Sequence, residues 1–207
     1  ISEGCNHTCA FCVIPDIRGA MRSRSIEDLV AQAEVMGRRG VREITLIAQD
    51  STAFGADIYG RPRLCDLLRR LDVVEGVEWI RLMYAYPTEV KDDLAAVLAS
   101  GRRLLPYLDV PVQHASDRVL ARMRRGYRSG DLYRMVERLR HHAPQIALRT
   151  TVIVGFPGET AEEFQETLDV VRRVEYDAAF TFKFSPRENT KAAGMADDVP
   201  LEEKQSR

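Results

Sequence analysis

The feature that most constrains the fold of this chain is a regular alternation between short β-branched runs and longer runs with helical periodicity. Such alternation is typical of repeated βαβ units around a parallel sheet. The β-branched runs recur at roughly thirty-residue intervals, which is the length of one βαβ unit. We therefore predict six strands, at residues 10–14, 43–48, 79–84, 107–112, 148–154 and 179–184.

Apolar residues spaced three and four apart predict helices between these strands. Ser25 followed by Asp28 has the form of a helix start, and Thr160 followed by Glu163 is a second such start. Gly40 ends the first helix. The apolar stripes are Ile26, Leu29, Val30, Ala33 and Met36; Leu64, Leu67, Leu68, Leu71 and Val74; Leu94, Val97 and Leu98; Leu132, Met135, Val136 and Leu139; and Phe164, Leu168, Val171 and Val174.

Six units, against the eight of a complete barrel, predict an α/β fold in the form of an open, partial (β/α)6 barrel. A chain of 207 residues, 45% of them hydrophobic, can bury one sizeable core, so residues 1–207 are expected to form one domain. In such folds the functional side chains lie at the carboxyl ends of the strands. We therefore expect the site residues to gather at one end of the barrel.

The formal net charge of -1 argues against binding to nucleic acid or to an anionic membrane by bulk charge. Residues 115–149 hold nine arginines against three acidic residues. This surplus of positive charge could contact RNA, or the arginines could simply lie on solvent-exposed helix faces. No apolar run suggests a membrane span or a signal peptide, so a cytoplasmic protein with no membrane partner is expected. Because the chain begins at Ile1, we expect it to be a domain excised from a longer protein.

Cys5, Cys9 and Cys12 form a C-x3-C-x2-C run, which leaves only Cys65 elsewhere in the chain. This clustering is unlike a disulfide framework. Three thiolates on one short loop can coordinate three corners of an iron-sulfur cube and leave one iron open to a small molecule. One alternative is a zinc site, which needs a fourth ligand such as His7 or Cys65. Another is a non-catalytic iron-sulfur or zinc module that only docks a partner.

This motif, with Phe11 before its last cysteine and βα units after it, resembles the radical S-adenosylmethionine (SAM) superfamily. Within that superfamily, residues 3–6, 15–24 and 154–160 resemble the methylthiotransferases. The resemblance implies that Cys5, Cys9 and Cys12 ligate a 4Fe-4S cluster whose fourth iron binds SAM. It also implies reductive cleavage of SAM to methionine and a deoxyadenosyl radical, with electrons from a donor such as flavodoxin or ferredoxin.

The resemblance further implies which residues surround SAM. Gln49 stands where the superfamily usually binds the amino group of SAM, and Ile153 matches its adenine-contacting strand pattern. Gln113 and Arg149 lie on strands expected to line the pocket. Arg149 could instead face outward, and Gln113 could contact the substrate rather than SAM.

A glycine-rich turn follows the fifth predicted strand. Gly155 and Gly158 permit close backbone approach, and the helix that begins after Thr160 is expected to present free N–H groups to a ligand. The alternative is a tight strand-to-helix turn without a ligand. Glu159 falls one place later than in the commonest form of the superfamily pattern. No catalytic residue is assigned, since His114 is either an acid or base or a hydrogen-bonded wall residue.

Two branches of the methylthiotransferases compete for this sequence. The RimO type methylthiolates the β-carbon of an aspartate in a small-subunit ribosomal protein, whereas the MiaB type methylthiolates N6-isopentenyladenosine next to the tRNA anticodon. Residues 48–52, 84–87, 107–111 and 113–116 resemble the first branch, and residues 182–187 resemble the second. We give the strand ends more weight, so a ribosomal protein is the expected partner and tRNA is the alternative.

Complete methylthiotransferases of both branches resemble this domain flanked by two others. One is an amino-terminal domain with a second 4Fe-4S cluster, and the other is a carboxyl-terminal β-domain that binds RNA or protein. We expect both to be absent from this chain. The chain is therefore expected to cleave SAM without completing sulfur insertion.

Overall fold

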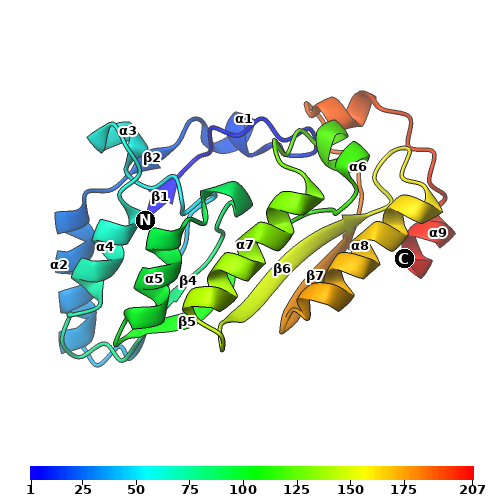
Figure 1. The fold of residues 1–207 in the computed structure, drawn as a ribbon. Helices are drawn as coiled ribbons and strands as arrows, with labels where there is room; N and C mark the ends of the chain where they lie inside the picture. Colours follow the sequence, from blue (N-terminus) through cyan, green and yellow to red (C-terminus); the bar gives the residue numbers. More distant parts are fainter.

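A computed structural model describes all of residues 1–207, which form a curled parallel sheet with helices packed along one face (Figure 1). The strands hydrogen-bond in sequence order and every neighbouring pair is parallel. The five strands are β3 (Glu43–Leu46), β4 (Trp79–Leu82), β5 (Leu104–Asp109), β6 (Ala147–Val154) and β7 (Ala178–Lys183). Two further strands, β1 (Ser2–Glu3) and β2 (Arg22–Ser23), form a separate antiparallel pair.

Five longer helices connect the strands and cover the sheet: α2 (Ile26–Arg38), α4 (Leu64–Leu71), α5 (Asp92–Ser100), α7 (Ser129–His142) and α8 (Ala161–Val174). The short elements are α1 (Ile14–Arg18), α3 (Ala56–Tyr59), α6 (Asp117–Arg122), α9 (Leu201–Ser206) and the 3-10 turns η1 (Pro87–Glu89) and η2 (Lys191–Gly194). A core of 32 buried residues fills the space between the helices and the sheet. None of the helices combines the length and the apolar character needed to cross a bilayer.

The expected open α/β barrel is confirmed, but its first predicted strand is wrong. Residues 10–14 form a turn that leads into α1, where Pro15 occupies the first turn. The Ala10 N–H donates to the Met123 carbonyl at 2.9 Å, and the Ala10 carbonyl accepts from the Ala192 N–H at 2.8 Å. Because these partners lie in η2 and at the carboxyl-terminal end of α6, residues 10–14 have no neighbouring strand to extend. The result is a half-barrel of five parallel strands.

The predicted strand 107–112 is displaced, since β5 ends at Asp109. Pro111 has no N–H to donate, so the regular ladder stops before it. The chain nevertheless stays beside β6, because the Val110 N–H donates to the Arg149 carbonyl at 2.8 Å and Gln113 bridges to Val152. The other four predicted ranges each overlap a strand of the sheet.

Both predicted helix starts are confirmed. The Ser25 hydroxyl accepts the Asp28 N–H at 3.2 Å, and Thr160 and Glu163 form a reciprocal capping box. The stripe predicted on α8 is only partly correct, because the buried residues are Glu163, Thr167, Val170 and Val174. Thr167 is drawn inward by the Ala115 N–H, which donates to its hydroxyl at 3.2 Å. The helix is rotated toward polar partners, which leaves Phe164, Leu168 and Val171 partly exposed.

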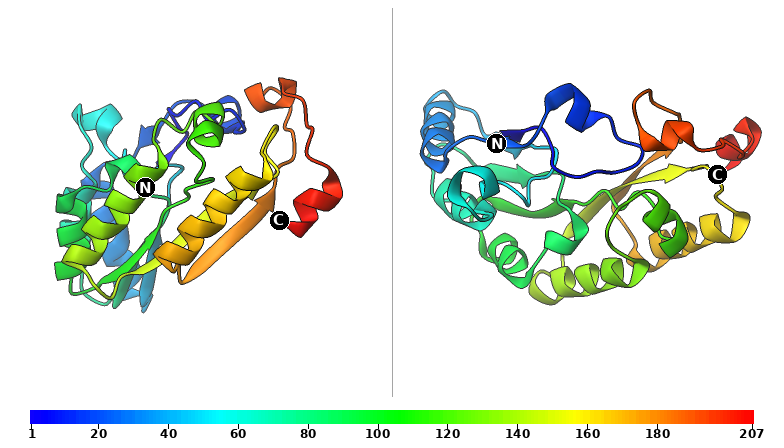
Figure 2. Two further views of the ribbon diagram at one scale, coloured as in Figure 1. Left: turned by 45° about the vertical axis from the view of Figure 1, so that its right-hand side comes forward. Right: turned by 90° about the horizontal axis from the view of Figure 1, so that it is seen from above.

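Burial alternates strictly along β6, which separates the two faces of the sheet. Leu148, Val152 and Val154 are buried, whereas Arg149 and Ile153 are partly exposed on the opposite face. The amino-terminal segment, blue in Figure 2, crosses the end of the half-barrel toward the orange and red carboxyl-terminal segment. This end of the sheet is therefore roofed by the loop that carries the clustered cysteines.

Candidate functional site

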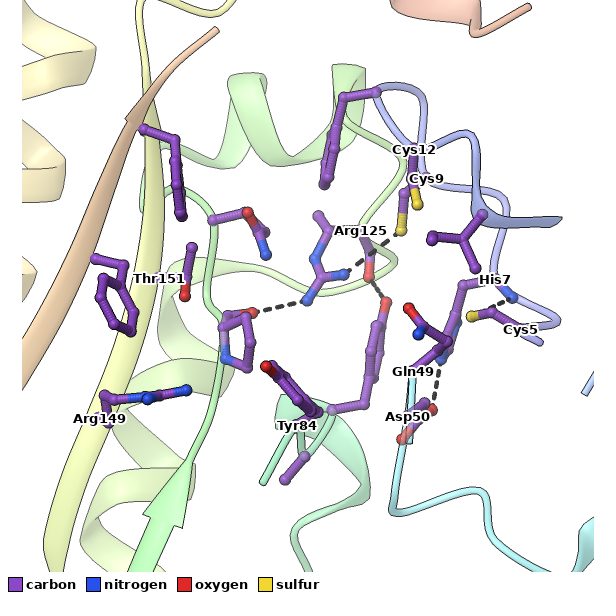
Figure 3. A pocket seen from close by; sticks show the side chains of 18 residues that line it. Cys5, His7, Cys9, Cys12, Gln49, Asp50, Tyr84, Arg125, Arg149 and Thr151 are labelled. Carbon is purple, nitrogen blue, oxygen red and sulfur yellow. Dashed lines mark hydrogen bonds and ion pairs between the residues drawn. The ribbon is translucent and has the colours of Figure 1, made fainter. Parts of the chain in front are cut away.

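A cavity of about 400 Å³ lies under the cysteine loop, and it is lined by residues of β6 and β7 and of the segments that follow β3, β4 and β5 (Figure 3). Such a position, at the carboxyl ends of parallel strands, is where ligands bind in open α/β folds. Its polar and aromatic lining consists of Cys5, His7, Cys9, Phe11 and Cys12 from the loop, and Gln49, Asp50, Tyr84, Tyr86, Gln113, Arg125, Arg149, Thr151, Phe180 and Phe182 from the barrel.

All three clustered cysteines line this cavity as free, half-buried thiols. Burial raises the pKa of the Cys5 and Cys12 thiols above the ordinary value. No three side chains of the His, Cys, Asp or Glu type, the clustered cysteines included, are placed to share a single metal ion. A 4Fe-4S cube instead takes each thiolate on a different iron. The donor set and its placement on one cavity therefore fit the cluster better than a single ion.

The two residues considered as a fourth zinc ligand are engaged elsewhere. His7 Nε2 lies 2.7 Å from Asp50 Oδ2, and the His7 ring stacks on Tyr86 with centroids 4.1 Å apart. Cys65 lies on α4, where its sulfur is 3.6 Å from Asp93 Oδ2 and outside this cavity. Burial and then Asp93 raise the pKa of Cys65 to about 12. Neither side chain completes a tetrahedral site with the cysteine loop.

A layered stack under the cysteine loop could not be predicted from the sequence. The Tyr86 ring lies between His7 and the Arg125 guanidinium, whose carbon is 4.7 Å from the ring centroid. The Tyr86 hydroxyl donates to the Arg125 carbonyl. Arg125 Nη1 in turn donates to Cys9 Sγ at 3.4 Å. No local signal distinguishes Arg125 from the other arginines between residues 115 and 149.

Three of the residues predicted to bind SAM, Gln49, Gln113 and Arg149, line the same cavity as the cysteines. Arg149 faces into the half-barrel, and its Nε donates to Asp109 Oδ1 at 2.8 Å. This hydrogen bond raises the pKa of Arg149 and fixes the guanidinium. Ile153 lines an adjoining cavity of about 500 Å³, which shares Gln113 and Cys12 with the first.

Two non-glycine residues of the cavity hold positive φ angles, Tyr84 at 60° and Gln113 at 65°. Such conformations cost on the order of 1–3 kcal/mol each and need support from the surrounding structure. The Tyr84 N–H donates to Asp109 Oδ2 at 3.2 Å, and the Gln113 N–H donates to the Thr151 carbonyl at 2.8 Å. Both strained positions follow strand ends, so the chain turns there to direct these side chains toward the cavity.

Gly155 and Gly158 lie outside both of these cavities. Their φ angles are +68° and +69°. A Cβ at Gly155 would lie 2.3 Å from Lys204 Cγ, and one at Gly158 would lie 2.3 Å from Arg122 Nη1. These glycines therefore make room for protein side chains, as the alternative of a tight strand-to-helix turn requires.

The polar groups of this turn are also paired within the protein. The Phe156 N–H donates to Glu159 Oε2 at 2.9 Å, and Glu159 Oε1 pairs with Arg207 Nη1 at 2.7 Å. The Thr160 N–H donates to Glu163 Oε2 at 2.9 Å. The Glu163 N–H in turn donates to the Thr160 hydroxyl at 3.2 Å, so the capping box engages two of the N–H groups at this helix start within the protein.

His114 is fully buried and does not line the cysteine cavity. Its Nδ1 accepts the Ser116 N–H at 3.0 Å, and its Nε2 lies 3.5 Å from Glu159 Oε2. These contacts agree with a hydrogen-bonded wall residue rather than with an acid or base that reaches a ligand.

Comparison with known proteins agrees with this geometry. The model of the Radical SAM superfamily matches residues 1–171. Over 207 residues the chain is 49% identical to the ribosomal protein uS12 methylthiotransferase RimO of Moorella thermoacetica. The matched region covers 100% of this chain and 48% of that protein. It is 45% identical over 207 residues to the protein of the same name from Aquifex aeolicus, again with 100% and 48% coverage. The chain spans about half the length of these relatives.

Solved structures share the fold. The radical SAM methyltransferase TsrM from Kitasatospora setae, with cobalamin and a [4Fe-4S] cluster bound, gives a TM-score of 0.71 at 19% identity over 87% of this chain and 35% of that one. The coproporphyrinogen III oxidase HemN from Escherichia coli gives a TM-score of 0.67 at 19% identity over 98% and 48%. The family model, the half-barrel and the three cysteines on one cavity agree, and the chain belongs to the radical SAM superfamily.

Proposed function

We propose that this chain is the radical SAM core of a methylthiotransferase that adds a methylthio group to the β-carbon of an aspartate in a small-subunit ribosomal protein. The single observation that carries the chemistry is the convergence of Cys5, Cys9 and Cys12 with Gln49, Gln113 and Arg149 on one cavity. The substrate is supported by the relatives described above, each of which is named a ribosomal protein uS12 methylthiotransferase. Their name favours this substrate over tRNA.

In this proposal each cysteine thiolate holds one iron of a 4Fe-4S cluster, and the fourth iron is left for SAM. The bound cluster supplies the electron that cleaves SAM, chemistry that no amino-acid side chain provides. Arg149, already oriented by Asp109, offers its remaining N–H groups to the SAM carboxylate. Gln49 accepts from the SAM amino group through its side-chain oxygen.

Aromatic rings in the cavity wall would limit the access of water to a reactive species, and two of them, Phe180 and Phe182, are still 50% and 56% exposed in this chain. Phe11 lies between the last two cysteines, and Phe180 and Phe182 project from β7 on the opposite side. Their rings supply an apolar surface without groups that react as acids or bases. The adjoining cavity that contains Ile153 is the proposed place for the adenine ring.

Completion of the reaction needs parts that this chain does not supply. Its four cysteines cannot hold two 4Fe-4S clusters, so we propose that the second cluster lies in an amino-terminal domain outside these residues. The electron would come from a small carrier of the flavodoxin or ferredoxin class. Because ribosomal proteins are assembled and used in the cytoplasm, we place the reaction there.

The test uses the complete enzyme that contains this chain, loaded anaerobically with iron and sulfide and supplied with SAM and a strong reductant. A peptide of uS12 that contains the target aspartate and an isopentenylated tRNA are offered in parallel, and mass spectrometry measures methylthio addition. Modification of the peptide, lost when its aspartate is replaced by alanine, is the expected result. Modification of the tRNA alone would assign the other substrate, and neither product with an intact cluster would overturn the proposal.

A further inference from the structure

Arg125 carries a buried charge that the chemistry above does not use. The chain turns at Arg124, whose φ is 56°, so that Arg124 is exposed and Arg125 points inward with only 7% of its surface accessible. Its guanidinium donates to the Pro111 carbonyl at 2.8 Å and to Cys9 Sγ at 3.4 Å (Figure 3). It also donates to the Tyr127 hydroxyl at 2.8 Å. The three acceptors are a hydroxyl, a cysteine sulfur and a backbone carbonyl.

A buried cation without an anionic partner is costly, by several kcal/mol. The faces of Tyr86 and Tyr127, with centroids 4.7 Å and 5.1 Å from the guanidinium carbon, offset part of this cost. No carboxylate accepts a hydrogen bond from this guanidinium. The positive charge of Arg125 is therefore balanced only when an anion occupies the side of the cavity on which Cys9 lies.

A 4Fe-4S cluster held by three thiolates is such an anion, and its negative charge grows by one when it accepts an electron. Hydrogen bonds to the ligand sulfurs and nearby charges are among the factors that set the reduction potentials of such clusters. A cation that donates to a ligand sulfur stabilises the more negative, reduced state. Arg125 has both properties and points at Cys9.

We propose that Arg125 raises the reduction potential of the cluster through a charged hydrogen bond to the Cys9 thiolate. Arg125 is thus a positioning residue that acts through the ligand. The electron comes from the external reductant, the cluster becomes more negative by one charge, and the guanidinium keeps its proton throughout. This inference rests on the cluster of the proposed function and does not depend on methylthio transfer.

The surroundings hold Arg125 in this orientation. Its backbone carbonyl accepts from the Tyr86 hydroxyl, and the Tyr86 ring is pinned from the other side by His7. The Tyr127 hydroxyl, which accepts from Arg125 Nε, donates onward to the Val112 carbonyl at 2.8 Å. The guanidinium is therefore fixed by groups from three separate segments and cannot turn to solvent without breaking several contacts.

The test is a redox titration of this chain, loaded anaerobically with iron and sulfide, without SAM, with the reduced cluster followed by electron paramagnetic resonance. Replacement Arg125→Met removes the charge at similar length, Arg125→Lys keeps it, and Arg124→Met removes the neighbouring exposed charge. At one applied potential, Arg125→Met is expected to lower the ratio of reduced to oxidised cluster roughly tenfold, or about 59 mV for a one-electron couple. Arg125→Lys should recover at least half of this shift on a logarithmic scale, and Arg124→Met should stay within about twofold of the parent.

An unchanged ratio in Arg125→Met, with the iron content and absorbance spectrum of the parent, would overturn the inference. If Arg125→Met fails to retain a cluster, Tyr127→Phe decides, because it keeps the charge but removes one of the three hydrogen bonds that orient the guanidinium toward Cys9. A ratio lowered about threefold would then support the inference, and an unchanged ratio would overturn it. A shifted potential in a complete enzyme that transfers no methylthio group would refute the proposed function and leave this inference intact.

Discussion

The cysteine loop, residues 5–12, and the strand-to-helix turn, residues 155–160, both lie near the carboxyl end of the sheet, yet their polar groups behave differently. The loop presents three free thiols to a cavity of about 400 Å³. In the turn, three backbone N–H groups donate to the carboxylates of nearby acidic residues, namely from Phe156 to Glu159, from Gly158 to Asp198 and from Thr160 to Glu163. Both segments matched ligand-binding patterns in the sequence.

The difference shows that a ligand site is marked by side chains able to ligate that face a cavity, and not by a permissive backbone alone. Glycines with positive φ serve equally well to admit a ligand or to admit another side chain of the same protein. At Gly155 the neighbour is Lys204, which is buried and paired with Asp197. The turn therefore fastens the carboxyl-terminal segment to the barrel, while the cysteine loop remains open to a cofactor.

The largest expected effect separates the clustered cysteines from the isolated one. Cys9→Ala should prevent assembly of a stable 4Fe-4S cluster, because only two thiolates remain on the loop. Cys65→Ala removes a thiol that lies outside the cavity and should leave the iron and sulfide content unchanged. Chemical analysis after anaerobic reconstitution measures both. Equal loss in the two variants would mean that Cys65 takes part in the site.

The next effect concerns the cavity wall. Arg149→Lys keeps a cation beside Asp109, which is fully buried, but loses the N–H groups left for a second carboxylate. We expect the Kd for SAM of the cluster-loaded chain to rise about tenfold, which corresponds to about 1.4 kcal/mol. Arg172→Lys, on an exposed face of α8, is the matched control. An unchanged Kd in equilibrium dialysis would remove Arg149 from the SAM site.

A glycine pair tests whether the turn is structural. Gly155→Ala should lower the free energy of unfolding by roughly 2–3 kcal/mol, because positive φ and overlap with Lys204 both oppose a side chain. Gly60→Ala has a φ of +72° but no neighbour within 4 Å, and should lose only about 1 kcal/mol. Denaturant unfolding measures both. If Gly155→Ala left stability intact and weakened SAM binding tenfold, the turn would be a ligand site.

The smallest effect is a pH dependence at the start of α8. The hydrogen bond from Arg118 lowers the pKa of Glu163 from 4.5 to about 2. A carboxylate with a depressed pKa adds stability above its unfolded value, and this stability is lost as the pH falls from about 4.5 toward 2. Glu163→Gln should therefore cost about 1 kcal/mol near neutral pH.

That cost should shrink toward zero in acid, as followed by urea unfolding across this pH range. Glu166→Gln on the exposed face of the same helix is the control and should leave the curve unchanged. A cost for Glu163→Gln that stays constant down to the lower limit would show that the ion pair with Arg118 contributes nothing.

Much of this fold follows from local patterns. The β-branched runs and the apolar stripes of α2, α4, α5 and α7 predict an open parallel barrel, because each helix needs one face against the core. The apolar run at 10–14 resembles a strand in the sequence, but Ala10 and Phe11 pack in a small core with side chains of α6, β6 and η2, and no strand pairs with this segment. The α8 stripe was misread because polar Glu163 and Thr167 are buried through partners on other segments.

The site also contains residues whose positions follow from the sequence and residues whose positions do not. The positions of Cys5, Cys9 and Cys12 follow from spacing, and those of Gln49 and Gln113 follow from the ends of predicted strands. The contact between Arg125 and Cys9 joins residues 116 apart and depends on a single αL turn at Arg124. Nothing in the local sequence of the nine arginines between residues 115 and 149 indicates which one reaches Cys9.

The most direct test of the account is whether this chain, loaded anaerobically with iron and sulfide, cleaves SAM when given a strong reductant. Chromatography of the reaction would quantify deoxyadenosine and methionine, with Cys9→Ala as the control. The account predicts both products in equal amounts from the parent chain and neither from the variant. A chain that carries a full 4Fe-4S cluster by its spectrum and iron content, binds SAM, and yet forms no deoxyadenosine would contradict it.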